Sequence, residues 1–268
     1  MSNTKSIQWP GKCDLFGAGI TPTCYAEAEE LILSAAEQRE SAIVTALPVH
    51  GVVTAAHDRE YREKISSFEL VVPDGQPVRW SLNCFYATKL RDRVYGPELM
   101  LRLCARAAEM GIGIYLYGSR PEVIERLKRN LERRWPTLRI VGDESPPFRP
   151  LDEEETDQLG QRINTSGAGM VFVGLGLPKQ DFFAYEMRRR IRAVLVCVGA
   201  AFDLHAGMRK MAPRWMQRCG LEWLFRLAQE PRRLWKRYLP TNAAFLLLVL
   251  QRLLGREKKI APVPISVE

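Results

Sequence analysis

The stretch VVPDGQPVRW places an acid between a short apolar run and a helix. Residues 70–72 are predicted to form a buried strand, because Pro73 ends its ladder of hydrogen bonds and Gly75 permits a tight turn into a helix from about Gln76. Asp74 would then lie at the carboxyl edge of a sheet, where open α/β sheets bind ligands and loop side chains face a crevice. A carboxylate there can take a proton from a bound ligand, or it can simply cap the following helix.

Other expected strand ends also carry polar residues or glycines. His50 follows the strand that holds Thr45. Gly118 and Ser119 follow another expected strand. The sequence GLGLPKQD, residues 174–181, begins at the last residue of the strand expected at 170–174. Glycines at a strand-to-helix turn let backbone N–H groups approach a phosphate, and the helix N-terminus adds a favourable potential. Several such turns on one sheet edge indicate a nucleotide-type ligand. His50 is either a ligand contact or a structural hydrogen-bonding residue.

Several well-known motifs are missing from the sequence. The G-x-G at 111–113 precedes its strand, and the G-x-G at 174–176 lacks the third glycine and the acidic partner of the dinucleotide fingerprint. A nucleotide-dependent oxidoreductase is therefore disfavoured. We find no Walker lysine motif, no HExxH and no hydrolase elbow. The acidic run 152–155 is better explained by its favourable position at a helix start than by metal binding.

Strands alternate with helices along most of the chain, which predicts an α/β fold with a Rossmann-like parallel sheet and helices on both faces. The strands are expected at residues 42–47, 70–72, 112–117, 138–141, 170–174 and 194–198. The helices are expected at residues 21–39, 76–87, 97–110, 121–134, 151–164 and 181–192, with a short helix after 48 and another from 58. Thr21 and Pro22 are the expected cap and first residue of the first helix.

The composition fits a cytosolic globular protein. The 268 residues, 46% of them hydrophobic, suffice for one large domain or a domain with an appendage. The six cysteines are scattered without a CxxC pair, which is typical of reduced residues rather than of disulfides or a zinc site. The N-terminus has no apolar signal region, and no window reaches the roughly 20 apolar residues of a bilayer span. We therefore expect the protein on the cytoplasmic side.

The basic charge is concentrated at the C-terminal end. The net charge is +8, yet residues 207–268 hold thirteen Lys and Arg against four acids. From Pro213 the pattern is helical only, and aromatic and basic residues flank an apolar segment at 243–250 that is too short to span a bilayer. We predict a core at 1–206 and a basic helical, membrane-associating appendage at 207–268, attracted by anionic lipid. The alternative is a helix pair packed on the sheet with solvated arginines.

Five ordered blocks of the sequence together resemble the WecG/TagA/CpsF family of bacterial glycosyltransferases over about residues 42–239. They are VVPDGQPVRW, RVYGPELM, IYLYGSRPEVIERLKRNLERRWPTLRIVG, VFVGLGLPKQDFF and VGAAFDLHAGMRKMAPRWMQRCGLEWLFRLAQEPRRLWKRYL. The resemblance implies an inverting transferase that moves a hexose from a UDP-sugar to a polyprenyl-diphosphate-linked saccharide in cell-surface or exopolysaccharide biosynthesis. It implies a peripheral protein on the inner face of the cytoplasmic membrane.

The partners follow from the same resemblance. We expect a UDP-sugar donor, a lipid-linked acceptor and the membrane surface, with no cofactor, no metal and no nucleic acid, in a possible homo-oligomer. The alternative function is a non-catalytic protein that binds polyanions or membranes.

The resemblance also assigns roles to residues. The proposed general base of the family falls on Asp74, and inversion needs one base to take the proton of the acceptor hydroxyl. The departing diphosphate needs positive charge. Because no DxD-type metal motif is found, arginines of the basic end are expected to supply it: Arg214, Arg232, Arg233 and Arg237. The Thr-x-Asn block of the family falls on residues 44–50, which here lack the asparagine.

The remaining candidates are substrate contacts, and Asp203 is assigned either to a sugar or ribose hydroxyl or to capping a turn. They are Thr45, His50, Gly75, Arg93, Tyr95, Gly96, Gly118, Ser119, Gly174, Gly176, Pro178, Lys179, Gln180 and Asp203.

Overall fold

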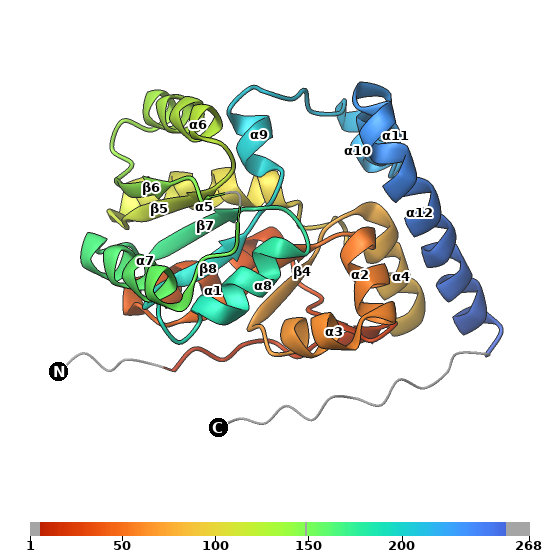
Figure 1. Cartoon of the computed structure of the whole chain (residues 1–268). Coiled ribbons are helices and arrows are strands. Elements are labelled where there is room, and N and C mark those ends of the chain that lie inside the picture. The colour runs from red at the N-terminus through yellow and green to blue at the C-terminus, as the bar shows by residue number, and fades with distance from the viewer. Residues whose placement is uncertain (1–5, 148, 256–268) are drawn as a thin grey trace.

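The computed structural model describes residues 6–147 and 149–255. Its centre is a six-stranded sheet in the order β4-β3-β8-β7-β5-β6, and every neighbouring pair of strands is parallel. The strands are β3 (Ala42–Leu47), β4 (Leu70–Pro73), β5 (Ile114–Gly118), β6 (Ile140–Glu144), β7 (Met170–Gly174) and β8 (Val194–Cys197). The predicted α/β class and parallel sheet are confirmed (Figure 1).

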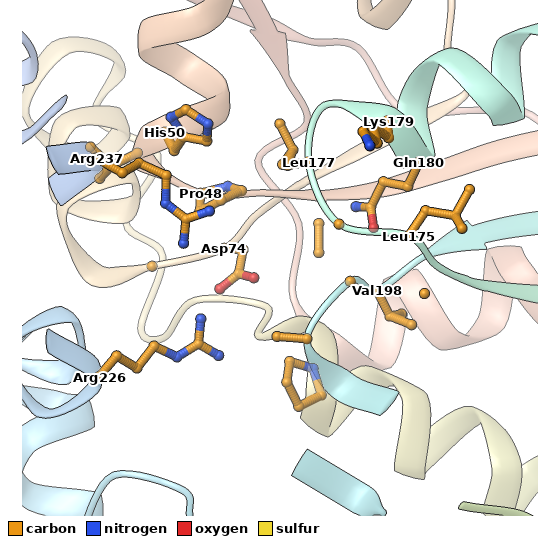
Figure 2. Close-up of a pocket in the computed structure, with 18 of the residues that line it drawn as sticks. Pro48, His50, Asp74, Leu175, Leu177, Lys179, Gln180, Val198, Arg226 and Arg237 are labelled. Atoms are coloured by element: carbon orange, nitrogen blue, oxygen red, sulfur yellow. The ribbon is translucent and has the colours of Figure 1, made fainter. Parts of the chain in front are cut away.

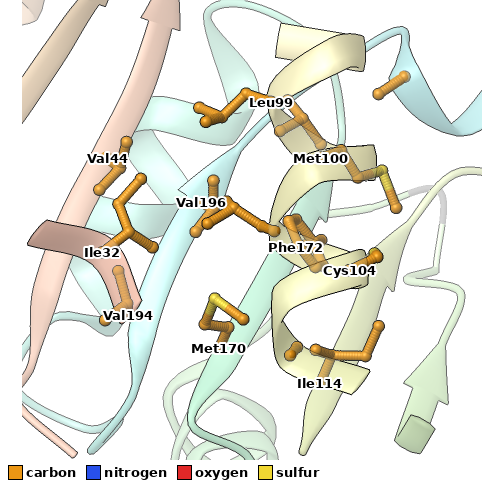
Figure 3. Close-up of a cluster of buried hydrophobic side chains, with 14 of the residues drawn as sticks. Ile32, Val44, Leu99, Met100, Cys104, Ile114, Met170, Phe172, Val194 and Val196 are labelled. Atoms are coloured by element: carbon orange, nitrogen blue, oxygen red, sulfur yellow. The ribbon is translucent and has the colours of Figure 1, made fainter. Parts of the chain in front are cut away.

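Helices cover both faces of the sheet. One face packs against α1 (Tyr25–Gln38), α5 (Gly96–Met110), α6 (Pro121–Arg134) and α9 (Ala201–His205). The other face packs against α2 (Val49–His57), α3 (Arg59–Ser66), α4 (Gln76–Tyr86), α7 (Glu153–Ser166) and α8 (Lys179–Met187). Neighbouring side chains of a strand point to opposite faces. Val44 and Phe172 therefore join the first cluster (Figure 3), while Ile43 and Val171 join the second.

The N-terminal segment differs from the prediction. Two short antiparallel strands, β1 (Cys13–Leu15) and β2 (Ala18–Ile20), precede the first helix. Thr21 does not cap that helix, which begins at Tyr25. The Thr21 amide instead donates to the Val71 carbonyl at 2.8 Å, and the Val71 amide donates to the Thr21 hydroxyl at 3.3 Å. The hydrogen bonds of β4 thus use the residue that was expected to start the helix.

The C-terminal part is helical, with α10 (Arg214–Arg218), α11 (Glu222–Gln229) and the long α12 (Pro231–Leu253). Helix α12 runs beside α2 (Figure 1), and its far end reaches the N-terminal hairpin, where Phe245 packs edge-on against Phe16 with ring centroids 5.9 Å apart. Arg252 donates to the Asp14 carbonyl at 3.0 Å. Within the described part of the chain, every helix is too short or too polar to cross a membrane. Residues 256–268 of the predicted appendage lie outside the described residues.

Candidate active site

A cavity of about 1250 Å³ opens at the carboxyl ends of the strands. Its floor is formed by the segments that follow β3, β4, β5, β7 and β8, and helices α4, α11 and α12 contribute its walls. Most of the predicted site residues line it: His50, Asp74, Gly75, Arg93, Tyr95, Ser119, Gly174, Gly176, Lys179, Gln180, Asp203, Arg233 and Arg237. The sequence therefore brings residues from five strand ends and the C-terminal helices to one place.

Asp74 lies in this cavity immediately after β4. Its amide donates to the Leu47 carbonyl at 3.2 Å, which joins the ends of β3 and β4. Gly75, with φ of 110°, starts α4 in a conformation that few other residues adopt, so the chain turns sharply after the acid. The Asp74 carboxylate accepts a hydrogen bond from the Gly96 amide at the start of α5, where a helix favours negative charge. It is therefore held by its neighbours and does not cap α4.

The environment of Asp74 raises its pKa to about 6. Burial is the largest cause, and the nearby Glu222 carboxylate acts in the same direction. Arg93 opposes both, with its Nη1 3.9 Å from Oδ1 of Asp74. The side chain still keeps 17% of its surface exposed to the cavity. A carboxylate with a pKa near neutrality is suited to general base catalysis.

Arg93 links Asp74 to the C-terminal helices. Its Nη2 lies 2.5 Å from Oε2 of Glu222 at the start of α11, and its guanidinium stacks over the Tyr95 ring at 4.2 Å. Arg226, one helical turn after Glu222, lies 3.7 Å from the other oxygen of that carboxylate. Two cations and two acids thus alternate across the boundary between the sheet and the C-terminal helices.

Arg226 and Arg237 point toward the Asp74 carboxylate from α11 and α12 (Figure 2). Arg226 also bonds to the Tyr238 side chain. The buried Nε of Arg237 has no hydrogen-bond partner among the described residues. These guanidinium groups provide positive charge on the open side of Asp74.

Glu222 and Arg226 are not among the site residues predicted from the sequence. The signal that could have found them is an acid and an arginine four residues apart inside the apolar run LEWLFRL, which puts both on one face of a helix. A buried glutamate in an otherwise basic segment requires a cationic partner.

His50 and Gln180 lie on other sides of the same cavity. Burial, with the charge of Arg237, lowers the pKa of His50 below its ordinary value, which favours the neutral ring. Gln180 is only 2% exposed, and its carboxamide oxygen has no hydrogen-bond partner among the described residues. A buried acceptor without a donor is a place where a ligand N–H or O–H can bind.

Several predicted contacts do not line the cavity. Thr45 is fully buried and donates to Asp181 at 2.7 Å. A side chain on Gly118 would come within 2.6 Å of the Gly174 backbone, so this glycine permits a close approach of two strand ends. Others outside the lining are Gly96, which lies beside the Asp74 carboxylate, and Pro178, Arg214 and Arg232.

Two further candidates are already paired inside the protein. Asp203 lies 3.2 Å from Arg209, and Arg233 pairs with Glu230. Any ligand bound by these side chains has to compete with, or add to, these ion pairs.

Within residues 6–147 and 149–255 we find no group of three or more His, Cys, Asp and Glu side chains arranged to hold a metal ion.

The structure is that of an α/β protein with a large cavity at the carboxyl edge of a parallel sheet, which is where open α/β sheets bind their ligands. A model of the glycosyl transferase WecG/TagA/CpsF family matches residues 13–259. The chain belongs to this family. Membership implies a glycosyltransferase of cell-surface polymer synthesis that uses a nucleotide-sugar donor and a lipid-linked acceptor.

Proposed function

We propose that the protein is an inverting, metal-independent hexosyltransferase that uses a UDP-sugar and a polyprenyl-diphosphate-linked saccharide. The observation that carries this proposal is Asp74, a partly buried carboxylate with a pKa raised to about 6, faced by Arg226 and Arg237 in a large cavity. A base and a cluster of cations are the two requirements of displacement at a sugar carbon with a diphosphate leaving group.

In the proposed reaction Asp74 takes the proton of an acceptor hydroxyl. The hydroxyl oxygen forms a bond to the anomeric carbon from the face opposite the UDP group, so the configuration inverts. UDP departs with the electron pair of the broken bond, and the guanidinium groups of Arg93, Arg226 and Arg237 stabilise the charge on its diphosphate. These arginines lie on elements far apart in the sequence, so the site is complete only when the C-terminal helices are docked.

The donor is assigned to the part of the cavity at the ends of β5, β7 and β8. Gly176 and Gly199 leave backbone exposed there, and beside them lies the Gln180 oxygen, which has no hydrogen-bond partner in the part of the chain that the structure describes. Lys179 and Ser119 complete this polar region. A uracil or sugar group with an N–H or O–H would satisfy the Gln180 acceptor.

The C-terminal helices are proposed to lie on the inner face of the cytoplasmic membrane. Large apolar side chains on α12 are exposed, among them Trp235 at 49%, Leu239 at 54% and Leu250 at 55%. Exposed aromatic and aliphatic residues beside Arg and Lys are typical of helices at a lipid interface. The division into a core at 1–206 and an appendage at 207–268 stays a prediction, as does the homo-oligomer, which sizing with and without detergent would test.

The proposal is tested by a transfer assay with purified full-length protein. We expect one or a few UDP-sugars to raise the melting temperature, because a ligand that prefers the native state stabilises it. The same donors should then glycosylate a polyprenyl-diphosphate saccharide in detergent, with product of inverted anomeric configuration and undiminished yield in a chelator. Retained configuration, or a requirement for added metal, would contradict the mechanism. Flotation with anionic vesicles tests the membrane contact.

A further inference from the structure

The cavity continues away from Asp74 as a groove between α4 and α12. One wall is a stripe of α4 at helical spacing, and the other wall is a stripe of α12. The lining residues of α4 are Pro77, Trp80, Ser81, Cys84 and Phe85, and those of α12 are Tyr238, Thr241, Asn242, Phe245, Leu246 and Val249. Residues three and four apart lie on one face of a helix, so each stripe faces the groove along its length.

Large apolar groups in this groove remain open to solvent. Trp80 is 43% exposed and Leu246 is 61% exposed, although both line the cavity. From Tyr238 to Val249 a helix advances about 16 Å. The far end is bordered by Phe85, over which the Arg252 guanidinium stacks at 4.7 Å. The groove is therefore a bounded apolar slot rather than a general apolar surface.

The two ends of the cavity differ in chemistry. Near Asp74 the arginines Arg226 and Arg237 face the open space (Figure 2). The groove beyond them carries no charged side chain among its named lining residues and is mainly apolar, with Ser81, Tyr238, Thr241 and Asn242 as its uncharged polar groups. An amphiphile with an anionic head and a hydrocarbon tail matches this order. A peptide or a glycan would leave most of its polar groups unpaired in such a slot.

We propose that the groove between α4 and α12 binds the first isoprene units of the lipid-linked acceptor. This inference rests on the proposed function, which sets the acceptor hydroxyl at Asp74 and the UDP diphosphate at Arg93, Arg226 and Arg237. The diphosphate of the acceptor itself is placed here at Arg237, which directly precedes the groove residue Tyr238 on α12 and is then shared between the two diphosphates. The chain that leaves the diphosphate then runs between Trp80 and Leu246 before it reaches the bilayer. The protein thus recognises the lipid as well as the saccharide. Short prenyl chains are poor ligands because they bury little apolar surface in the groove.

The test compares binding of geranylgeranyl diphosphate and of inorganic pyrophosphate to full-length protein by calorimetry, without membranes or detergent. Leu246→Asp places a charge in the groove, and Leu247→Asp is its matched control. Leu247 is the next residue, is 56% exposed and does not line the cavity. We expect wild type to bind the prenyl compound at least about tenfold more tightly than pyrophosphate. Leu246→Asp should remove this difference and leave pyrophosphate binding unchanged, while Leu247→Asp keeps the difference.

The proposal that the groove binds isoprene units is wrong if wild type binds geranylgeranyl diphosphate and pyrophosphate with equal affinity. It is also wrong if Leu246→Asp and Leu247→Asp have equal effects. Transfer assays with acceptors of increasing chain length separate this outcome from failure of the proposed function. If the rate of transfer does not depend on prenyl chain length, the glycosyltransferase proposal stands and the prenyl-binding proposal is wrong. If prenyl diphosphate binds tightly in the groove but no sugar is transferred, the proposed reaction is wrong and the prenyl-binding proposal stands.

Discussion

Arg93 and Glu222 form a buried ion pair, with 2.5 Å between Nη2 of Arg93 and Oε2 of Glu222, and this pair joins the α/β core to the C-terminal helices. The same guanidinium lies 3.9 Å from the Asp74 carboxylate. The charge around Asp74 therefore depends on Glu222, which lies almost 150 positions further along the sequence. Removal of either partner would leave the other charge buried and uncompensated, which is costly.

Replacement of Asp74 by Asn tests the general base. We expect the turnover of sugar transfer to fall about 10²–10⁴-fold, because that is the usual contribution of a positioned base. The measurement is transfer from the UDP-sugar to the lipid-diphosphate acceptor, with circular dichroism as the control for folding. Full turnover in a folded Asp74→Asn protein would rule out this assignment.

The same substitution should stabilise the fold at neutral pH. The pKa of Asp74 rises from its ordinary 3.8 to about 6 in the folded protein, so the unfolded chain loses its proton first as pH rises. Stability therefore falls between about pH 4 and about pH 6, and the loss persists above that range. We expect Asp74→Asn to melt a few degrees higher than wild type at pH 7.5 and at the same temperature below about pH 4. A lower melting temperature at pH 7.5 would indicate that the carboxylate stabilises the fold instead.

The pH dependence of kcat/KM should follow Asp74. Activity is expected to rise with an apparent pKa of about 6 and to level off above it, because the base must be ionised in the free enzyme. His50 also lines the cavity, but its pKa is lowered by burial. The His50→Gln variant should therefore keep the midpoint of the wild-type profile. A profile that becomes flat in His50→Gln would assign the titration to the histidine.

Replacement of Glu222 by Gln should change both the profile and the stability. The negative charge of Glu222 raises the pKa of Asp74, so its removal moves the midpoint of the pH profile to lower pH. Breaking the buried pair with Arg93 should also cost about 3–5 kcal/mol in the free energy of unfolding. Glu230→Gln is the control, since Glu230 pairs with Arg209 and Arg233 instead. An unchanged midpoint in Glu222→Gln would mean that the C-terminal helices do not act on the base.

The arginines of α12 should differ in their effects. Arg237 points toward Asp74, whereas Arg232 is exposed and does not line the cavity. We expect Arg237→Gln to lower kcat about tenfold to hundredfold through loss of charge at the departing diphosphate. Arg232→Gln should stay within about threefold of wild type in detergent. Equal losses in both variants would show that the net charge of the helix matters rather than the position of one group.

The periodicity of the sequence was sufficient to predict the sheet. The ranges expected for β3 and β7 are those observed, because buried parallel strands are short apolar runs bounded by turn residues. The N-terminal hairpin was not predicted, since strands of three residues carry almost no pattern. The start of α1 was wrong because the hydrogen bonds of Thr21 to Val71 are long-range contacts, which local propensity does not contain.

The position of a site residue could be predicted where it directly follows a recognisable strand. Asp74 was placed at a sheet edge by the run before it, and it lies there. The choice among the basic residues of the C-terminal helices could not be made in the same way. Arg226 and Arg232 both lie in C-terminal helices that mix apolar and basic residues. Only the packing of α12 on α2, and of α11 on α12, decides which of the two faces the cavity.

The contact of α12 with the N-terminal hairpin brings together segments that are synthesised at opposite ends of translation. The hairpin and Asp74 leave the ribosome early. Glu222, Arg226 and helix α12, whose Phe245 packs against Phe16, emerge near the end of translation. A nascent chain therefore contains Asp74 long before it contains Arg226 and Arg237. A chain that ends before α11 lacks the cations that face Asp74, so the proposed site is complete only after the C-terminal helices have been synthesised.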